Sequence, residues 1–438
     1  MTGFKTGSAS ASEDAVQLSR EDKRMLAGNH GEAAQIAMRI ILAIARIQGA
    51  RRLIDISHVH IGGSIYTGEG SLRVIRQLTQ LGAKVRVPTT INAISIDRKR
   101  WRDRNIEEEF AAKADELASA FEAMGARPIF SCTPYVYPDA PKYGQDILWA
   151  ESNAITYANS VIGARTNRHG DFMDVCAAIT GRVPQSGLHM ESNRVGNFLV
   201  RVPAVQNPDG TYFATLGYLI GKHTGQLVPV IDGIRTKPSL EDLKAFSSTI
   251  TTSGAVGLFH MVGITPEAET VDAALQGLEP LKILDVELHE LEEVWADLST
   301  GSGKAVSQVV LGSPHFTFGE FVEMAAATKG KTKNHDTTVL VTTSRFTYEK
   351  AKQAGLLQTL EDFGATVNTD TCLCMLNPSS FPESAQTVMT NSGKFAHYGP
   401  GLTSRGVYFG SINDCVESAV AGTLRLSRPK WLEPFAPQ

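Results

Sequence analysis

Short apolar segments alternate with amphipathic helical segments along most of this chain, and this alternation limits the fold more than any other feature. Segments with apolar residues at helical spacing are found at 67–81, 106–124, 146–160, 240–251, 319–327 and 347–357. The apolar segments predicted to be strands are 53–63, 83–92, 127–135, 227–233, 255–263, 307–315, 338–344 and 365–375. Repeated strand–loop–helix units predict an α/β protein whose parallel or mixed sheets are flanked by helices.

The first helical region is predicted to run from residue 21 to about residue 48. Ser19 followed by Asp22 is a helix N-cap signal, and Gly28 with Gly31 divides the region into two helices. Residues 1–18 carry no apolar stretch of the kind that a secretory signal needs. We therefore expect a disordered N-terminal segment over 1–18 and a cytoplasmic protein. Near the other end, 394–399 and 407–411 are further strand candidates.

The length of 438 residues exceeds what one hydrophobic core supports, so lobes are expected within a module that covers 19–438. A soft boundary is predicted near Pro266–Asp285, where the strand–helix alternation is interrupted. A net charge of −4 provides no basic field for nucleic acid or an anionic membrane. The longest apolar run, around Ile40–Ile47, is broken by arginine and is too short to cross a bilayer. Neither a nucleic-acid partner nor a membrane is expected.

Five cysteines are present, and an odd number in a chain of this kind argues against a disulfide framework. Cys132 ends a predicted strand before Pro134, so its thiol is held at a loop where it could bind a metal, act as a nucleophile, or simply be buried. Cys372 and Cys374 would share one face of a strand. The absence of a second cysteine pair disfavours structural zinc, while an iron–sulphur cluster with distant ligands stays open. Core packing is the preferred role for Cys374, and a structural role for Cys415.

Polar and glycine-containing motifs recur along the chain, several of them just after predicted strands, where open α/β sheets bind ligands, and one, Gly163–Arg168, after a predicted helix. They are Ser57–Gly63, Pro88–Asn92, Gly163–Arg168, Gly312–His315 and Thr390–Tyr398. The last motif has the hydrogen-bonding capacity and the fixed cation that suit a carboxylate substrate, although a solvated loop is equally compatible. Arg165 or Arg168 could clamp a carboxylate or could form a surface pair. The two histidines of the first motif favour a polar substrate loop over a metal site.

Taken together and in this order, the motifs resemble those of the aconitase X family from about Leu26 to the C-terminus. The matching stretches are PTTINA, IDRKRW, CTPY, NSVIGARTNR, GSPH, DTC and NSGKFAHY. Each is weak evidence on its own, whereas six or more in register over most of the chain are specific. The resemblance implies the aconitase-like large catalytic module without its swivelling domain, and a separate small subunit that carries that domain.

The resemblance also implies an iron–sulphur-dependent dehydratase that acts on a small hydroxy acid. Cys132 and Cys372 match the cluster cysteines of the family. Ser313 stands where archaeal members have a third cysteine, and a serine oxygen is a poorer iron ligand than a thiolate. We therefore expect a 2Fe–2S cluster in preference to a 3Fe–4S or 4Fe–4S cluster, with Ser313 ligating the metal or lying beside it.

Bacterial members with this feature dehydrate cis-3-hydroxy-L-proline to Δ1-pyrroline-2-carboxylate, and the resemblance implies the same reaction here. The expected catalytic residues are Ser313, His315, Lys394 and His397. Substrate-binding residues are expected at Ser64, Thr89, Thr90, Arg165, Asn167, Asn391 and Ser392. The alternatives are a mevalonate 5-phosphate dehydratase, an aconitase-like isomerase, and a non-catalytic binding subunit whose cysteines are only core residues.

Overall fold

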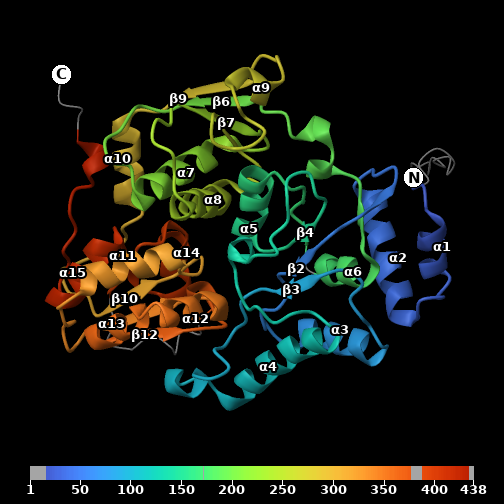
Figure 1. Cartoon of the computed structure of the whole chain (residues 1–438), viewed down its shortest axis with the longest axis horizontal. Helices are drawn as coiled ribbons and strands as arrows, with labels where there is room; N and C mark the ends of the chain where they lie inside the picture. Colours follow the sequence, from blue (N-terminus) through green and yellow to red (C-terminus); the bar gives the residue numbers. More distant parts are fainter. Residues whose placement is uncertain (1–15, 171, 376–386, 434–438) are drawn as a thin grey trace, which may run out of the picture.

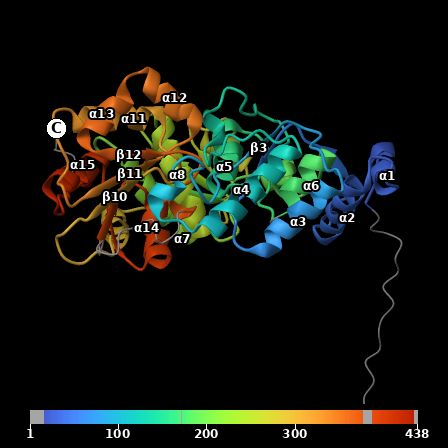
Figure 2. The same cartoon turned by 90° about the horizontal axis from the view of Figure 1, so that it is seen from below.

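The computed structural model describes residues 16–170, 172–375 and 387–433. They form three α/β units that are arranged around a common junction (Figure 1). The turned view in Figure 2 places the first and third units at opposite ends of the molecule. The predicted α/β class, with parallel sheets flanked by helices, is confirmed.

The first unit carries a three-stranded parallel sheet of order β3-β2-β4 and an antiparallel pair of strands, β1 and β5. Its helices are α1 (Arg20–Leu26), α2 (Glu32–Ile47), α3 (Glu69–Gln80), α4 (Glu108–Ala123), α5 (Ser152–Tyr157) and α6 (Met173–Thr180). Its strands are β1 (Leu53–Asp55), β2 (Val59–Ile61), β3 (Thr89–Ile91), β4 (Leu148–Trp149) and β5 (Arg182–Pro184). Ser19 and Asp22 cap α1 reciprocally, as the sequence predicts.

The second unit is a four-stranded parallel sheet of order β8-β7-β6-β9. It comprises β6 (Phe198–Arg201), α7 (Gly210–Thr224), β7 (Pro229–Asp232), α8 (Leu240–Gly254), β8 (His260–Met261), α9 (Val271–Leu275), β9 (Lys282–Asp285) and α10 (Leu288–Asp297). Helices α7 and α8 pack with almost no side chain between them: a Cβ on Gly217 would lie 2.7 Å from the Phe246 carbonyl oxygen, and one on Gly254 would lie 2.1 Å from the Gly221 carbonyl oxygen. This close packing brings the N-termini of both helices toward the third unit.

The third unit is a five-stranded parallel sheet of order β12-β11-β10-β13-β14. It comprises β10 (Gln308–Leu311), α11 (Phe318–Thr328), β11 (Thr338–Thr342), α12 (Arg345–Gln353), α13 (Leu356–Phe363), β12 (Ala365–Asn368), β13 (Thr387–Thr390), α14 (Gly393–Thr403), β14 (Gly406–Phe409) and α15 (Ile412–Ala421). Because all five strands are parallel, the loops after them meet at one edge of the sheet.

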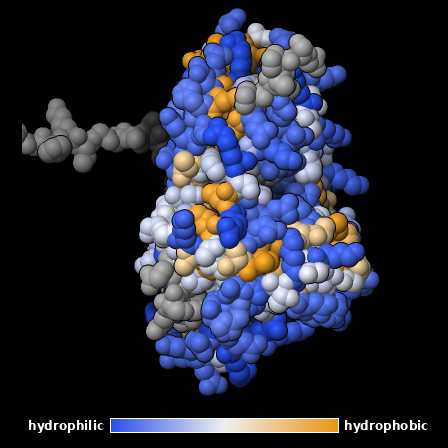
Figure 3. Space-filling view, turned by 90° about the vertical axis from the view of Figure 1, so that its left-hand side faces the viewer, coloured by the Kyte–Doolittle hydropathy of each residue, from blue (hydrophilic) through white to orange (hydrophobic). Residues whose placement is uncertain are grey.

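The three units share a core. The largest cluster of buried apolar side chains includes Trp149 from the first unit, Phe246 from the second and Phe409 from the third. Side chains that reach the junction are therefore held by packing from every side. The face shown in Figure 3 is mainly hydrophilic, with apolar side chains in smaller patches.

Several predicted elements need correction. The predicted boundary at Pro266–Asp285 lies inside the second unit, because β9 pairs with β6; the sheet changes only after β9. Residues 127–135 form no strand beyond a single bridge from Arg127 to Thr90. The predicted helix over 146–160 begins with β4, and 394–399 belongs to α14 and not to a strand.

The strand predicted over 365–375 and the disordered segment predicted over 1–18 also differ from the structure. Strand β12 ends at Asn368, so Cys372 lies in the loop that follows and Cys374 lies in a short 3₁₀ turn, Leu373–Met375. Of the segment predicted to be disordered, residues 1–15 lie outside the described residues, whereas Gln17 forms a parallel bridge with Arg52. Within the described ranges, no helix has the length and the apolar character needed to span a membrane.

Candidate active site

Three cysteine side chains meet at the junction of the first and third units. Cys132 lies in the segment after α4, whereas Cys372 and Cys374 lie after β12. The thiols of Cys132 and Cys372 contact each other, and Cys372 also contacts Cys374. Ala93 packs with the two buried thiols, and Met375 lies against them. The structure thus brings the two predicted cluster cysteines together and adds Cys374, for which the sequence favoured core packing.

We call the thiols of Cys132, Cys372 and Cys374 together the cysteine centre. The loop after β10 contacts all three of them. The Ser313 hydroxyl lies 3.2 Å from the Cys374 sulphur and 3.6 Å from the Cys372 sulphur. The backbone N–H of His315 donates to the Cys132 sulphur at 3.1 Å. In the part of the chain that the structure describes, no group of three or more His, Cys, Asp or Glu side chains is arranged to hold a metal ion. The thiols instead hydrogen-bond to one another.

An anchored turn holds the loop that carries Cys372. Asp370 adopts a left-handed φ of 68°, and its carboxylate accepts two hydrogen bonds from the Arg345 guanidinium, at 2.6 and 2.7 Å. The Asp370 carbonyl accepts from the Ile94 N–H at 2.8 Å, and Asp97 accepts from the Thr369 N–H at 2.9 Å. The IDRKRW and DTC motifs, distant in the sequence, therefore fix each other.

The thiols share a negative charge. Hydrogen bonds from Cys132 and Cys374 lower the pKa of Cys372 well below its usual value, and the nearby cations of the site contribute. Burial, with the contact from Cys372, raises the pKa of Cys132, and the same contact followed by burial raises the pKa of Cys374. Cys372 is therefore the most acidic of the three thiols, because its two neighbours donate hydrogen bonds to it.

A buried ion pair lies beside the cysteine centre. The Lys394 ammonium is 3.0 Å from the Glu151 carboxylate, which also accepts from the amides of Asn92 at 3.1 Å and Asn153 at 2.8 Å. The Asn153 amide donates to the Cys132 carbonyl as well, at 3.0 Å. Burial alone would lower the pKa of Lys394, but the charges of Glu151 and of the three thiols raise it.

Sequence reasoning selected Lys394 and missed Glu151 and Asn153. The reason is the misassigned helix over 146–160, which concealed the short strand β4. Glu151 stands just after that strand, at the carboxyl end where the polar motifs of the other strands were found. Recognition of β4 would have brought it into the candidate list.

His315 is fixed behind the cysteine centre. Its ring Nε2 lies 2.8 Å from the Thr371 carbonyl oxygen, and burial lowers the pKa of the imidazole, so the ring is neutral. Its Nδ1 is buried and has no hydrogen-bond partner among the described residues. The His315 carbonyl accepts from the buried Lys244 ammonium at 3.2 Å, and Lys244 also pairs with Glu320.

A cavity of about 280 Å³ opens at the other side of the loop after β10. Strand β10 pairs with β11 on one side and with β13 on the other, so the chain order reverses there. Open α/β sheets bind ligands at such a switch point, outside the carboxyl ends of the strands. Ser313 and Pro314 after β10, and Asn391 and Ser392 after β13, all line the cavity. Ser313 thus borders both the cavity and the cysteine centre.

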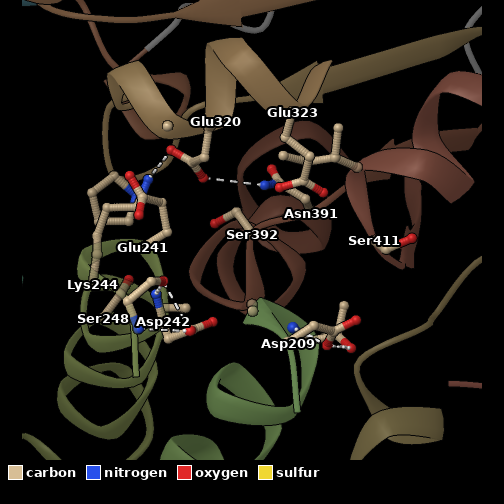
Figure 4. A pocket seen from close by; sticks show the side chains of 18 of the residues that line it. Asp209, Glu241, Asp242, Lys244, Ser248, Glu320, Glu323, Asn391, Ser392 and Ser411 are labelled. Atoms are coloured by element: carbon tan, nitrogen blue, oxygen red, sulfur yellow. Dashed lines mark hydrogen bonds and ion pairs between the residues drawn. The ribbon is translucent and has the colours of Figure 1, made fainter. Parts of the chain in front are cut away.

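The walls of the cavity are acidic (Figure 4). The carboxylates that line it are Asp209, Glu241, Asp242, Glu320 and Glu323, and Lys244 is also in the wall. Asp209, Asp242 and Glu320 cap the N-termini of α7, α8 and α11, respectively, so the helices explain part of this acidity. Glu241 accepts from the Thr317 hydroxyl at 2.7 Å, and Glu323 lies one turn into α11.

Two lining residues are not accounted for by packing. The Glu323 side chain reaches solvent, but partial desolvation by the cavity wall, with the like charges of Glu320 and the other wall carboxylates, raises its pKa to about 7. Ser248, on α8, is only 2% exposed, and its hydroxyl has no hydrogen-bond partner within the described residues. A small polar ligand in the cavity would supply partners for both groups.

The sequence matches family models along almost its whole length. The aconitase X first domain matches residues 15–192, the second domain 196–296 and the third domain 306–421. This chain belongs to the aconitase X family. The three domains of the family correspond to the three units of the fold.

Curated relatives within the aconitase X family are dehydratases. Two named cis-3-hydroxy-L-proline dehydratase, from Hypocrea jecorina and Pseudomonas aeruginosa, are each 44% identical to this chain over 97% of its length, which covers 72% and 73% of those proteins. The phosphomevalonate dehydratase large subunit of Methanosarcina mazei is 35% identical, over 94% of this chain and 98% of that protein. These relationships make the chain a carbon–oxygen lyase.

A solved aconitase X structure has the same fold. The holo-form of Thermococcus kodakaraensis aconitase X superposes with a TM-score of 0.82 at 29% sequence identity. The match covers 92% of this chain and all of that chain.

Other residues expected from the aconitase X resemblance lie at varied distances from the cysteine centre. Thr90 and Ser64 are buried: Thr90 hydrogen-bonds to the His60 ring at 2.8 Å, and the Ser64 hydroxyl donates at 3.1 Å to the carbonyl of Ala93, the residue that packs with the thiols. Thr89 donates to the Val87 carbonyl. Burial lowers the pKa of His60 to about 3, so this histidine is neutral. Of these side chains, Ser64 is the one linked to the centre, through Ala93.

The remaining expected residues are engaged elsewhere. Arg165 forms an ion pair with Glu191, and the Asn167 amide donates to the Ser186 carbonyl at 2.9 Å. Among the residues that line the cavity, neither Arg165 nor Asn167 is present, and neither contacts the thiols. His397 is exposed on α14, where its ring hydrogen-bonds to the Tyr218 hydroxyl at 2.7 Å.

Proposed function

We propose that this chain dehydrates cis-3-hydroxy-L-proline, and that the acidic cavity binds the ring ammonium of this substrate. Two relatives named for this activity share 44% identity with almost the whole chain, whereas the phosphomevalonate dehydratase large subunit of Methanosarcina mazei shares 35%. The observation that carries the choice between the two substrates is the charge of the cavity wall.

A phosphate-bearing substrate suits this cavity poorly. Five carboxylates line it, and the ammonium of Lys244 is buried and already paired with Glu320. A phosphate group would meet like charge without a cation to bind it. A secondary ammonium, in contrast, can donate to Glu241 and Glu323, and each charged hydrogen bond contributes about 1.5–3 kcal/mol. The acidic wall therefore supports a zwitterionic amino acid.

The carboxylate of such a substrate has a candidate site at the start of α14. Asn391, Ser392 and Gly393 line the cavity at the start of α14, where the N-terminus of an eleven-residue helix attracts anions. The Asn391 amide makes a long contact of 3.4 Å with Glu320, so it can turn toward a carboxylate at little cost. Because the ring nitrogen and the carboxylate of a hydroxyproline are bonded to the same carbon, both must be held on neighbouring parts of the wall, and Asn391 does lie beside the acidic residue Glu320.

We further propose an iron–sulphur cluster at the cysteine centre. The donors fit such a cluster, because Cys132, Cys372 and Cys374 are three soft thiol ligands in a buried site, with the Ser313 hydroxyl beside two of them. A 2Fe–2S cluster is favoured, since a serine replaces a thiolate. When bound, iron would supply Lewis-acid assistance to the departing hydroxide.

The residues of this chain would bind the substrate, orient it and keep water out. Dehydration removes the α-proton and the neighbouring hydroxyl group, and the enamine that forms gives Δ1-pyrroline-2-carboxylate by a proton shift. The Lys394 ammonium is a fixed cation beside the cysteine centre, where it would stabilise the negative charge of the departing hydroxide. The neutral His315, with its buried Nδ1, is the assigned proton-handling group next to the thiols, and His397 stays a second candidate.

A small swivelling-domain subunit is the proposed partner, and the proposal includes a further catalytic hydroxyl on that subunit. The match to the Methanosarcina mazei protein covers 98% of a chain that is named a large subunit, which supports a two-subunit enzyme. We propose a cytoplasmic location for the complex.

The test is an activity assay on anaerobically purified protein, combined with its small subunit. Cis-3-hydroxy-L-proline should be consumed, and mevalonate 5-phosphate should not; free inorganic phosphate at millimolar concentration should not compete. Iron and sulphide analysis on the same sample checks the cofactor. Turnover of mevalonate 5-phosphate, or competition by phosphate, would overturn the substrate assignment, and a colourless iron-free protein would support the non-catalytic alternative.

A further inference from the structure

Lys394 occupies a position that electrostatics disfavours. It is the second residue of α14, at the end of the helix where the backbone dipole repels a cation, and its side chain is only 7% exposed. Burial of an ammonium in such a place requires a compensating anion. Glu151 supplies that anion from the first unit, at 3.0 Å.

Both oxygens of the Glu151 carboxylate are hydrogen-bonded within the site. Its carboxylate, 6% exposed, accepts from Asn92, Asn153 and Lys394, so both oxygens have polar partners and the group is rigid. Although burial raises the pKa of Glu151, the Lys394 charge and these hydrogen bonds lower it overall, and the carboxylate stays ionised. Asn153 connects this network to the backbone of Cys132, at 3.0 Å.

The pair differs from an ordinary buried ion pair elsewhere in the chain. Arg194 and Glu267 form such a pair, with Arg194 1% exposed, but its other partners are the Asn159 side chain and backbone carbonyls, and it does not contact the thiols. The Lys394 charge, in contrast, acts on all three cysteines. The Arg194–Glu267 pair therefore ties the first unit to the second, whereas the Lys394–Glu151 pair lies beside the cysteine centre.

We propose that Glu151 is a positioning residue that holds the Lys394 ammonium against the cysteine centre and thereby sets the charge that this centre experiences. This inference rests on the proposed function, because it concerns the group bound by the three thiols. Glu151 does not touch the substrate. It acts through Lys394, whose charge offsets the negative charge that builds up as hydroxide departs.

The experiment compares the reduction potential of the cluster in four variants of the anaerobically purified enzyme. Glu151→Gln removes a negative charge and should raise the potential, whereas Lys394→Met removes a positive charge and should lower it. Glu151→Asp keeps the charge and should leave the potential near that of the wild type. Glu267→Gln, which breaks the pair with Arg194, is the matched control and should leave the potential unchanged.

Kinetics give a second, independent measurement. Glu151→Gln and Lys394→Met should each lower kcat by tenfold or more with little change in KM, and Glu151→Asp should recover part of the loss. Potentials that move in the same direction for Glu151→Gln and Lys394→Met would show a merely structural role and overturn the inference. If all variants bind no iron, double-mutant analysis of thermal unfolding tests the pair in the metal-free protein, and independent effects of the two substitutions would overturn it there.

Discussion

The cysteine centre and the acidic cavity lie on two sides of one loop, yet their side chains differ in burial and in how firmly they are held. At the centre, Cys132 and Cys372 are fully buried, and their contacts are short and mutual. At the cavity, Glu323 is exposed and lacks the fixed hydrogen bonds that hold Glu320. Ser313 is the residue that they share.

Under the proposed function, the cysteine centre would carry out the chemistry and the cavity would recognise the substrate. A centre that must polarise a leaving group needs a rigid, dry environment, in which each charge has a large effect. A cavity that admits and releases a small zwitterion needs groups whose partners are supplied by the ligand. Substitutions at the centre should therefore abolish the rate, whereas substitutions in the cavity should mainly change KM.

The largest effect is expected from Cys132→Ser. Removal of this thiolate should bleach the visible iron–sulphur absorption, because a hydroxyl is a poor iron ligand. Loss of several kcal/mol of charge stabilisation corresponds to a fall in kcat of roughly a thousandfold or more. Absorption spectra, iron content and kcat, measured on the same anaerobic sample, check this expectation, and Cys372→Ser should behave in the same way.

Cys415→Ser is the matched control for this prediction. Cys415 is also fully buried, but it lies on α15 within an apolar cluster of the third unit and not with the other thiols. The variant should keep its colour and its kcat. If Cys132→Ser also kept both, the centre would be core packing and the proposed cofactor would be wrong.

The sequence predicted the cysteine centre better than the cavity, and the reason is physical. Local pattern left the roles of Cys132 and Cys372 open, and it was the aconitase X resemblance, carried by motifs in register along the chain, that predicted Cys132, Cys372 and Ser313 as one group. Cys374 packs against the core, as the sequence favoured, but its contact with Cys372 was not foreseen, because the predicted strand extended over it whereas the anchored turn at Asp370 follows the end of β12.

The acidic wall left no comparable signal. Asp209, Asp242 and Glu320 each stand at a helix start, where a carboxylate is expected as a cap and attracts no further interpretation. Only the packing of α7 and α8 against the third unit brings these three helix ends together around one cavity. That arrangement depends on contacts between residues far apart in the sequence, which no local pattern contains.

A moderate effect, dependent on pH, is expected from Glu323→Gln. In the wild type, protonation of Glu323 near pH 7 removes the charge that binds the substrate ammonium, so KM should rise as the pH falls from 8 to 6. In the variant, KM should be raised about tenfold, equivalent to about 1.4 kcal/mol, and should no longer depend on pH in this range. Steady-state kinetics across the range check both statements.

Stability should respond to the same substitution with a defined sign. The pKa of Glu323 is about 7 in the folded chain and 4.5 in its unperturbed state, so the folded state retains a proton that the unfolded state loses. Folding stability from this group should therefore fall as the pH rises between these values, and Glu323→Gln should remove that slope in thermal unfolding.

For the kinetic prediction on Glu323, a KM that rises with pH in the wild type would contradict an ammonium-binding role.

The smallest effect is expected from Arg165→Ala, which tests the limit of the recognition region. Arg165 was a candidate carboxylate clamp, but its guanidinium pairs with Glu191, a residue with a side chain 62% exposed. Surface pairs of this kind contribute about 0–1 kcal/mol, so stability should change little. Because Arg165 does not line the cavity, KM should stay within about twofold of the wild type. Asn391→Ala is the contrasting variant at the carboxylate rim and should raise KM clearly. A large rise in KM for Arg165→Ala alone would move the carboxylate site away from the start of α14 and toward the border of the first and second units.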